Sequence, residues 1–210
     1  MRSGGTGFRT AAFDQRRVRG FTLIELLVTM AIVLMMFAML SGSGMQSYQR
    51  RQKQVCNKNL QSIYVALDIY ANDHTGGFPL NTNATTSEQT LAALVPQYTA
   101  SAAAFTCPGS SDRPIPEGES FEKRRISYAY YMGRQRTNTN EPLLSDEQVD
   151  SLPKIKGGPL FSRDGKSPGN NHNKYGGNLM FVDGHVETVS ATAPYSILIP
   201  PGVTLLNPKR

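Results

Sequence analysis

The stretch RGFTLIE, residues 19–25, opens an apolar run of about twenty residues that ends at Leu40. A helix rises about 1.5 Å per residue, so a run of this length can span a bilayer. Its only charged residue is Glu25, and a carboxylate inside a membrane-length apolar segment is costly. The sequence therefore predicts a membrane helix whose single acid has a function.

A basic leader precedes the run and ends at Gly20. Residues 20–25, GFTLIE, resemble the type IV prepilin signal of pilins and of type II secretion pseudopilins. In that family a prepilin peptidase cuts after the glycine on the cytoplasmic face and methylates the new N-terminal phenylalanine. The resemblance implies processing at Gly20 and Phe21, with residues 1–20 as the cleaved leader.

The resemblance also implies a role for Glu25 in assembly. Cleavage would create an α-amino group on Phe21, which is largely cationic at neutral pH, and methylation leaves that charge in place. In a bundle of such helices, Glu25 of one subunit would meet the Phe21 amine of its neighbour. Opposite charges attract far more strongly in a low-dielectric bundle than in water, so burial of Glu25 would favour the correct register.

Two other kinds of targeting segment fit less well. A secretory signal has an apolar core of about 7–15 residues and no acid, and a plain signal anchor does not explain Glu25. The flanking charges indicate only weakly which end of the helix is cytoplasmic, because both ends carry basic residues: three arginines lie within residues 16–19 and three basic residues within 50–53. The leader motif implies a single pass through the inner membrane, with the C-terminal domain periplasmic or extracytoplasmic.

Composition argues against nucleic acid as a partner. The 210 residues carry a net charge of +6, but residues 1–20 hold five arginines and one aspartate. Without the leader, 17 basic and 15 acidic residues would remain, a net charge of +2. No basic stripe is left that would bind phosphates.

The chain has room for an anchor and one domain of ordinary size. We expect a transmembrane and assembly helix over 21–45, an amphipathic half of the same helix over 46–79, and a globular region over 80–210. The amphipathic half is indicated by apolar residues at steps of three and four, and Gly76-Gly77 with Pro79 stops it. This apolar stripe consists of Cys56, Leu60, Ile63, Leu67 and Tyr70.

The globular region shows a short helix and several strands. We expect the helix at about 87–95 with Ser87 as its cap, and strands at 126–132, 142–144 and 178–189. The tail, 195–206, is either a last edge strand or a loose segment. The fold class is α+β, a pilin fold in which one long N-terminal helix packs on a small antiparallel sheet.

In the last of these strand segments, Asp183-Gly184 separates two β-rich runs, which predicts a two-residue type I′ hairpin turn. We expect residues 178–182 to pair with 185–189, and Leu179 and Phe181 to face the long helix.

Residues 172–184, HNKYGGNLMFVDG, resemble the His-X9-Asp-Gly segment near the C-terminus of many prepilin-like proteins. Its marker residues here are His172, Gly177, Asp183 and Gly184. Ten residues separate His172 from Asp183 instead of nine, and a loop at 173–175 would absorb the extra one.

His172, Asp183 and His185 could also be catalytic residues or metal ligands. No accompanying nucleophile, zinc-binding or paired-carboxylate motif supports catalysis, and for zinc both cysteines lie far away in sequence. The structural interpretation is preferred: Asp183-Gly184 turns the hairpin, and His172 hydrogen-bonds the loop over it. We therefore expect no enzyme, no catalytic residue and no metal site.

No cofactor is expected, with calcium as the one ion left open. Some secretion pseudopilins hold Ca²⁺ in the loop before their final strands, and Asp146, Glu147 and Asp150 are oxygen ligands in such a segment here. A solvated acidic turn is the commoner explanation of such a cluster.

Cys56 and Cys107 are the only cysteines. On the extracytoplasmic side a disulfide between them would persist, yet Cys56 shares the apolar stripe and would also suit a buried thiol. Both interpretations stay open at this stage.

The resemblance implies a structural subunit that is processed by prepilin peptidase. It would assemble with other pilin-like subunits into a type II secretion pseudopilus or a type IV pilus-like filament. The alternative is an extracytoplasmic enzyme or ligand-binding domain tethered by a prepilin-type anchor. A compact pocket lined by His172, Asp183 and His185 would favour that alternative.

Overall fold

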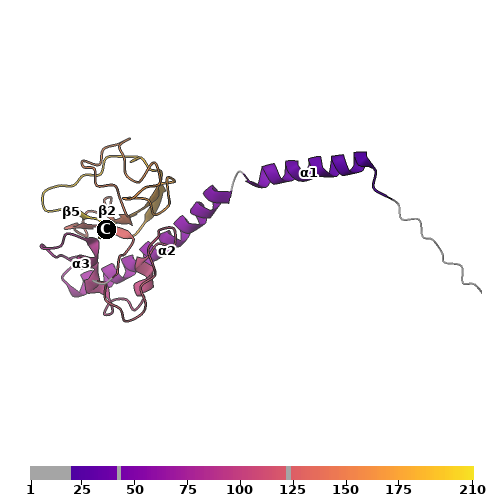
Figure 1. The fold of residues 1–210 in the computed structure, drawn as a ribbon. Helices are drawn as coiled ribbons and strands as arrows, with labels where there is room; N and C mark the ends of the chain where they lie inside the picture. Colours follow the sequence, from indigo (N-terminus) through magenta and orange to yellow (C-terminus); the bar gives the residue numbers. More distant parts are fainter. Residues whose placement is uncertain (1–19, 42–43, 122–123) are drawn as a thin grey trace, which may run out of the picture. The chain divides into compact units, whose positions relative to one another are not determined.

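The structure, a computed structural model, describes residues 20–41, 44–121 and 124–210. The chain forms two compact units (Figure 1). The first ends at Ser43 and contains helix α1 (Leu23–Ser41), and the second is the globular unit from Gly44 to Arg210.

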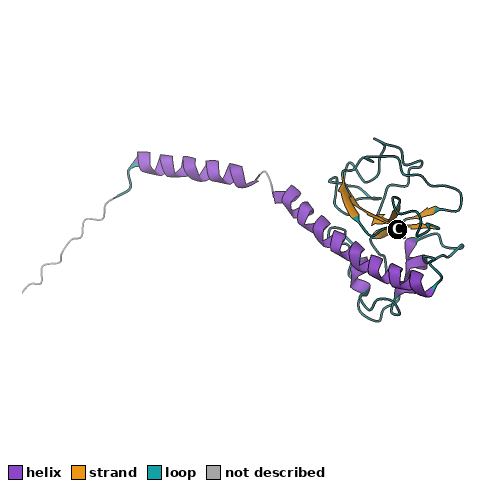
Figure 2. Ribbon diagram, turned by 180° about the vertical axis from the view of Figure 1, so that it is seen from behind, coloured by secondary structure: helices purple, strands orange, loops and turns teal. Residues whose placement is uncertain are grey.

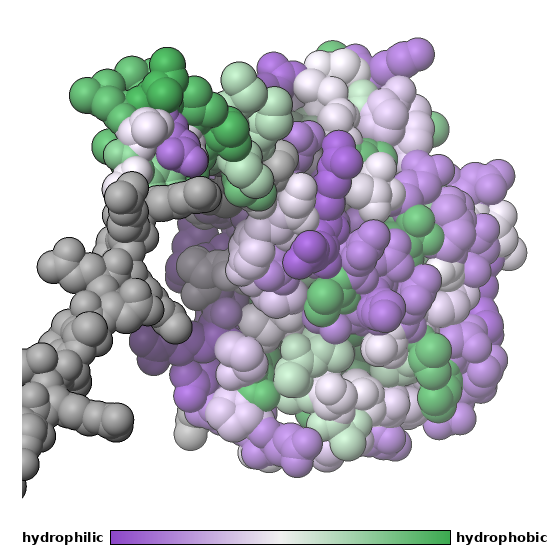
Figure 3. All heavy atoms as spheres, turned by 90° about the vertical axis from the view of Figure 1, so that its right-hand side faces the viewer, coloured by the Kyte–Doolittle hydropathy of each residue, from purple (hydrophilic) through white to green (hydrophobic). Residues whose placement is uncertain are grey.

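Helix α1 is apolar on every side. Its stretch Leu23–Leu40 is long and apolar enough to cross a membrane, and among the described residues it alone meets that test. In Figure 3 the helix stands out as a hydrophobic surface, whereas the visible face of the globular unit is mostly hydrophilic. The leader, residues 1–19, lies outside the described residues.

The single long helix expected from the sequence is described as two elements. Helix α1 ends at Ser41 and helix α2 (Gly44–Asp73) begins three residues later, within the glycine- and serine-rich stretch 41–44. Residues 42–43 lie outside the described residues.

The apolar stripe of α2 is confirmed. Cys56, Leu60, Ile63 and Leu67 are buried, and Tyr70 packs against the same core in a partly buried position. This packing supplies the stability that an isolated helix of modest propensity would lack.

Three short elements follow α2. Helix α3 (Ser87–Leu91) continues into the 3₁₀ turn η1 (Ala92–Leu94), and a second turn, η2 (Ala102–Phe105), packs on α2. The N-cap of α3 is Thr86, not Ser87 as expected. The Gln89 side chain accepts hydrogen bonds from the backbone N–H groups of Thr85 and Thr86, at 2.7 and 3.3 Å, which places the start of the helix.

The five strands form one antiparallel sheet in the order β4-β3-β2-β1-β5. They are β1 (Tyr128–Met132), β2 (Pro142–Asp146), β3 (Gly177–Phe181), β4 (Val186–Val189) and β5 (Thr204–Leu206). The tail therefore contributes an edge strand, β5, which pairs with β1. The fold class is α+β, as the sequence predicted.

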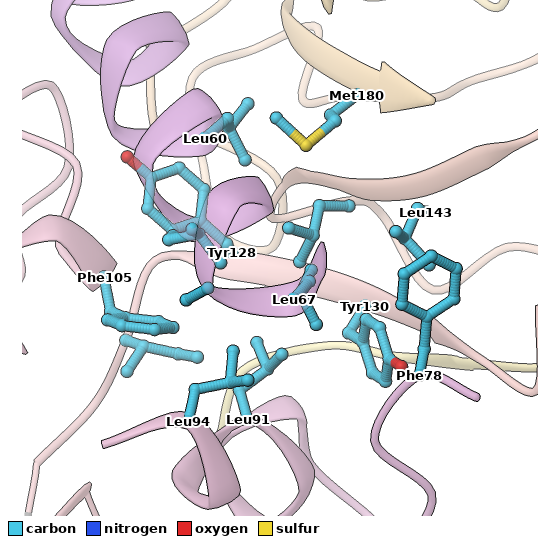
Figure 4. Packing of buried hydrophobic residues seen from close by; sticks show 14 of the residues in the cluster. Leu60, Leu67, Phe78, Leu91, Leu94, Phe105, Tyr128, Tyr130, Leu143 and Met180 are labelled. Atoms are coloured by element: carbon cyan, nitrogen blue, oxygen red, sulfur yellow. The ribbon is translucent and has the colours of Figure 1, made fainter. Parts of the chain in front are cut away.

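Both faces of this sheet are buried, because helices cover one face and the C-terminal loops cover the other (Figure 2). On the helix side, Leu60 and Leu67 of α2 lie among Tyr128, Tyr130 and Met180 of the sheet (Figure 4). We call this layer the helix-side core.

The opposite layer, the tail-side core, contains Tyr131 and Leu179 from the sheet with Phe161, Ala193 and Ile197 from the C-terminal loops.

The expected orientation of the last hairpin is wrong. Leu179 and Phe181 belong to the tail-side core, while Met180 and Val182 face α2. The prediction assumed that only one face of the sheet is buried. Because loops from residues 150–203 cover the second face, the larger apolar pair is buried there.

The turn also differs from the expected type I′. Gly184 N–H donates to the Phe181 carbonyl at 3.0 Å, and Phe181 N–H donates to the His185 carbonyl at 3.0 Å. Positive φ occurs at Gly184 (88°) and not at Asp183. This pattern is a three-residue loop with glycine in the left-handed position, which needs one special residue instead of two.

We expect Gly184→Ala to destabilise the fold more than Gly202→Ala does. Both glycines have positive φ, so each alanine costs about 1–2 kcal/mol. A Cβ at Gly202 would meet nothing within 4 Å, whereas one at Gly184 would lie 2.6 Å from the Tyr64 ring. Overpacking of this kind adds about 1 kcal/mol or more. Urea unfolding of both variants measures the difference, and equal midpoints would contradict the docking of the turn on α2.

Candidate functional site

The segment predicted to be processed lies at the start of α1. Gly20 and Phe21 are exposed and precede the helix. Thr22 and Glu25 bond reciprocally: Glu25 N–H donates to Thr22 Oγ1 at 3.3 Å, and Thr22 N–H donates to Glu25 Oε2 at 3.4 Å. This is a capping box, which satisfies two backbone donors at a helix N-terminus.

The capping box gives Glu25 a local role that sequence analysis missed, although the Thr-x-x-Glu spacing is its signature. The carboxylate also lies in the first turn, where the helix dipole favours negative charge. Thr29 donates its hydroxyl to the Leu26 carbonyl at 2.9 Å, which keeps this polar group satisfied within α1.

A disulfide joins Cys56 of α2 to Cys107, just after η2, with the Cα atoms 5.4 Å apart. Both residues are fully buried. The bond closes a loop of 51 residues, for which the chain-entropy model gives a stabilisation of roughly 4 kcal/mol. It attaches the segment after η2 to α2.

A buried ion pair lies beside the disulfide. His172 Nε2 is 3.2 Å from Asp146 Oδ2 and 3.6 Å from Cys107 Sγ, and neither His172 nor Asp146 is exposed. Two asparagines complete the surroundings of the carboxylate. Asn171 Nδ2 donates to Oδ1 at 3.1 Å, and Asn178 donates its backbone N–H to Oδ2 at 2.7 Å.

These contacts set the charge state of Asp146. Burial by itself would raise the pKa of this carboxyl. The charge of His172 and the hydrogen bonds from His172 and the two asparagines outweigh burial, so the pKa lies below its usual value. Nearby, burial lowers the pKa of Lys53, whose ammonium donates to the Tyr175 carbonyl, and the charge of Asp146 opposes that shift.

The fold separates His172 from the other two residues that we considered for catalysis. Asp183 and His185 pair with each other on the exposed hairpin turn, with Nδ1 and Oδ1 2.5 Å apart. The expectation that His172 bonds the loop over the hairpin is wrong, because its ring faces Asp146 and Cys107. Gly177 begins β3, where a Cβ would lie 2.8 Å from the Phe161 ring, so glycine permits that contact.

The three carboxylates considered for calcium point to different partners. Asp146 is the last residue of β2 and is buried with His172, not part of an exposed loop. Glu147 lies 2.8 Å from the Arg125 guanidinium, and Asp150 accepts from Asn207 at 2.9 Å. The calcium expectation stays a prediction.

The structure instead brings together four potential metal ligands that the sequence analysis did not group. Ligand atoms of Cys56, Cys107, Asp146 and His172 all lie within 4.8 Å of one another. Distance in sequence was the reason for rejecting zinc, but α2, the segment after η2, β2 and the loop before β3 converge here. No spacing motif could have revealed this, because each residue comes from a different element.

Comparison with protein families matches residues 15–41 to the prokaryotic N-terminal methylation motif. The chain carries this motif. The match includes Gly20, Phe21 and Glu25 and extends to the end of α1, consistent with a prepilin-like protein. The comparisons with curated proteins and with solved structures found no match to this chain. The resemblance of residues 172–184 to the His-X9-Asp-Gly segment stays a prediction.

We expect Asp146→Asn to lower the free energy of unfolding by about 3 kcal/mol, since removing one partner leaves His172 buried without its counter-charge. The matched control, Asp183→Asn, changes an exposed His–Asp pair and should cost less than about 1 kcal/mol.

The lowered pKa of Asp146 determines how the stabilisation by this carboxylate depends on pH. Its contribution is present above the ordinary carboxyl pKa of about 3.9 and is lost as pH falls through the folded-state pKa. The gap between wild type and Asp146→Asn should therefore close in acid. Urea unfolding from about pH 5 to about pH 2 tests this, and a gap that widens below the ordinary carboxyl pKa would contradict it.

Proposed function

We propose that this chain is a pilin-like structural subunit. A prepilin peptidase would cleave it after Gly20 and methylate Phe21, and the product would assemble with other pilin-like subunits. The assembly would be a type II secretion pseudopilus or a type IV pilus-like filament, of which we favour the pseudopilus. The match of residues 15–41 to the methylation motif carries this proposal.

The other features support the same function. Helix α1 offers an apolar surface with a single acid near its start, as subunits that pack helix against helix would need. A buried disulfide suits an oxidising compartment and therefore an extracytoplasmic globular unit anchored in the inner membrane. The Phe21 amine of one subunit would meet Glu25 of the next.

A tethered enzyme is less well supported. His172 is fully buried against a disulfide and a carboxylate, so substrate could not reach it. Asp183 and His185 lie on an exposed turn and face each other. The three residues therefore do not line a common pocket, which was the observation that would have favoured catalysis.

We expect cells with a prepilin peptidase to convert the chain to a product that begins with N-methyl-Phe21. Gly20→Val should block cleavage, because a branched side chain at the cut site hinders access to the backbone. Gly7→Val, a change within the leader away from the cut, is the control and should be processed normally. Intact-mass measurement decides, and a mature N-terminus elsewhere would refute the proposal.

Substitutions at Glu25 separate its local role from its role between subunits. Glu25→Gln keeps an oxygen that accepts the Thr22 N–H, so the capping box survives, but it removes the charge that would pair with the neighbour's amine. We expect Glu25→Gln to insert into the membrane normally and to fail in filament assembly. Thr22→Val, which breaks the box and keeps the charge, should still assemble.

The measurement is the yield of subunit in sheared filaments relative to the membrane fraction. Insertion of Glu25→Gln should not suffer, because a charged residue in the apolar segment costs about 2.5–3.5 kcal/mol on insertion scales. If Glu25→Gln assembled as wild type and Thr22→Val did not, Glu25 would be a helix cap only.

A further inference from the structure

Four potential metal ligands converge in the globular unit, and all four are fully buried. Cys56 comes from α2, Cys107 follows η2, Asp146 ends β2 and His172 precedes β3. Two cysteine sulfurs, once reduced, with one imidazole and one carboxylate form a set of ligand types that zinc binds in proteins, usually four in a tetrahedron.

The distances within the cluster suit that geometry. With metal–ligand bonds of about 2.0–2.3 Å, ligand atoms of a tetrahedral zinc site lie roughly 3.3–3.8 Å apart. The His172 nitrogen is 3.2 Å from the Asp146 oxygen and 3.6 Å from the Cys107 sulfur. All four ligand atoms lie within 4.8 Å of one another, and the two sulfurs, which are bonded to each other, would have to separate.

Neighbouring groups already hold the ligands in place. Gly109 N–H donates to Cys107 Sγ at 3.4 Å, a contact that would stabilise the Cys107 thiolate in the reduced chain. Asn171 and Asn178 orient the Asp146 carboxylate, as outer-shell partners do for metal ligands. Glycine at position 109 allows the segment after Cys107 to lie close to the His172 ring, since a Cβ there would be 2.6 Å from His172 Nδ1.

We propose that the chain binds one Zn²⁺ in this cluster when Cys56 and Cys107 are reduced. The two thiols lose their protons as the thiolates coordinate, and His172 gives up the Nε2 proton that it donates to Asp146. The freed ring nitrogen and the Asp146 carboxylate complete the site. In the oxidised chain the sulfurs bond to each other and offer no thiolate, so the disulfide excludes the metal. Either form attaches the segment after η2 to α2. This inference does not depend on the proposed function.

The test uses the full chain in detergent micelles. One sample is reduced with a phosphine, and the other keeps its disulfide. Both are exposed to zinc chloride, desalted without oxygen and analysed for bound metal. We expect about one zinc per reduced chain and less than a tenth of that per oxidised chain. Cobalt(II), used in place of zinc, should give a thiolate charge-transfer band and a tetrahedral visible spectrum only with the reduced chain.

Variants of the reduced chain identify the ligands. Asp146→Asn and Cys56→Ser each remove one ligand by a near-isosteric change, and each should weaken zinc binding at least tenfold. Asp183→Asn and His185→Gln alter the exposed His–Asp pair and should bind zinc as wild type does. Two ligand variants are used because Asp146→Asn also weakens the fold, and circular dichroism with and without zinc follows the folded fraction.

Three results would overturn the proposal. The reduced wild type could hold no more zinc than the oxidised chain. Both ligand variants could bind zinc as tightly as wild type, which would mean adventitious binding at the surface. The reduced chain could lose its helical circular dichroism equally with and without zinc, which would show that the metal does not replace the disulfide.

Discussion

The globular unit depends on one packing interaction, the burial of the apolar stripe of α2 against the sheet. Leu60, Ile63 and Leu67 lie in the helix-side core with Tyr128 and Tyr130 of β1. Fully burying one such aliphatic side chain is worth about 1.5–3 kcal/mol, so the stripe supplies more than any single polar contact in the unit. The disulfide at Cys56 lies on the same stripe and prevents the segment after η2 from separating from the helix.

A buried polar pair lies at the junction of three elements of the globular unit. The Asp146–His172 pair lies where α2, β2 and the loop before β3 meet, with Asn178 linking the carboxylate to the backbone of α2 through the Lys53 carbonyl. Buried ionic groups add little net stability, because desolvation offsets their attraction. They do penalise any arrangement in which one partner is left alone. The pair therefore specifies how β2 meets the loop that precedes β3.

The N-terminal unit follows a different rule, since its apolar surface is exposed on every side in the single chain. A helix of this kind is stable in a membrane or among similar helices. Glu25 is the one charged residue of this helix. In one chain it completes a capping box with Thr22, and among several chains its charge would need a partner. The two units thus differ in how they are stabilised: the globular unit has its own core, whereas the apolar surface of α1 is exposed.

The sequence by itself determined the membrane-length helix, the apolar stripe of α2 and the positions of most strands, because these rest on local composition and periodicity. The methylation motif was found by its resemblance to a known signal. Alternation could not decide which side of the last hairpin faces α2, since both faces of the sheet are buried. Leu179 and Phe181 therefore pack against loops that flank the hairpin in the chain, an outcome set by tertiary packing. The same holds for the cluster of Cys56, Cys107, Asp146 and His172. Its members come from four elements, and only their packing around one core brings a disulfide, a carboxylate and an imidazole together.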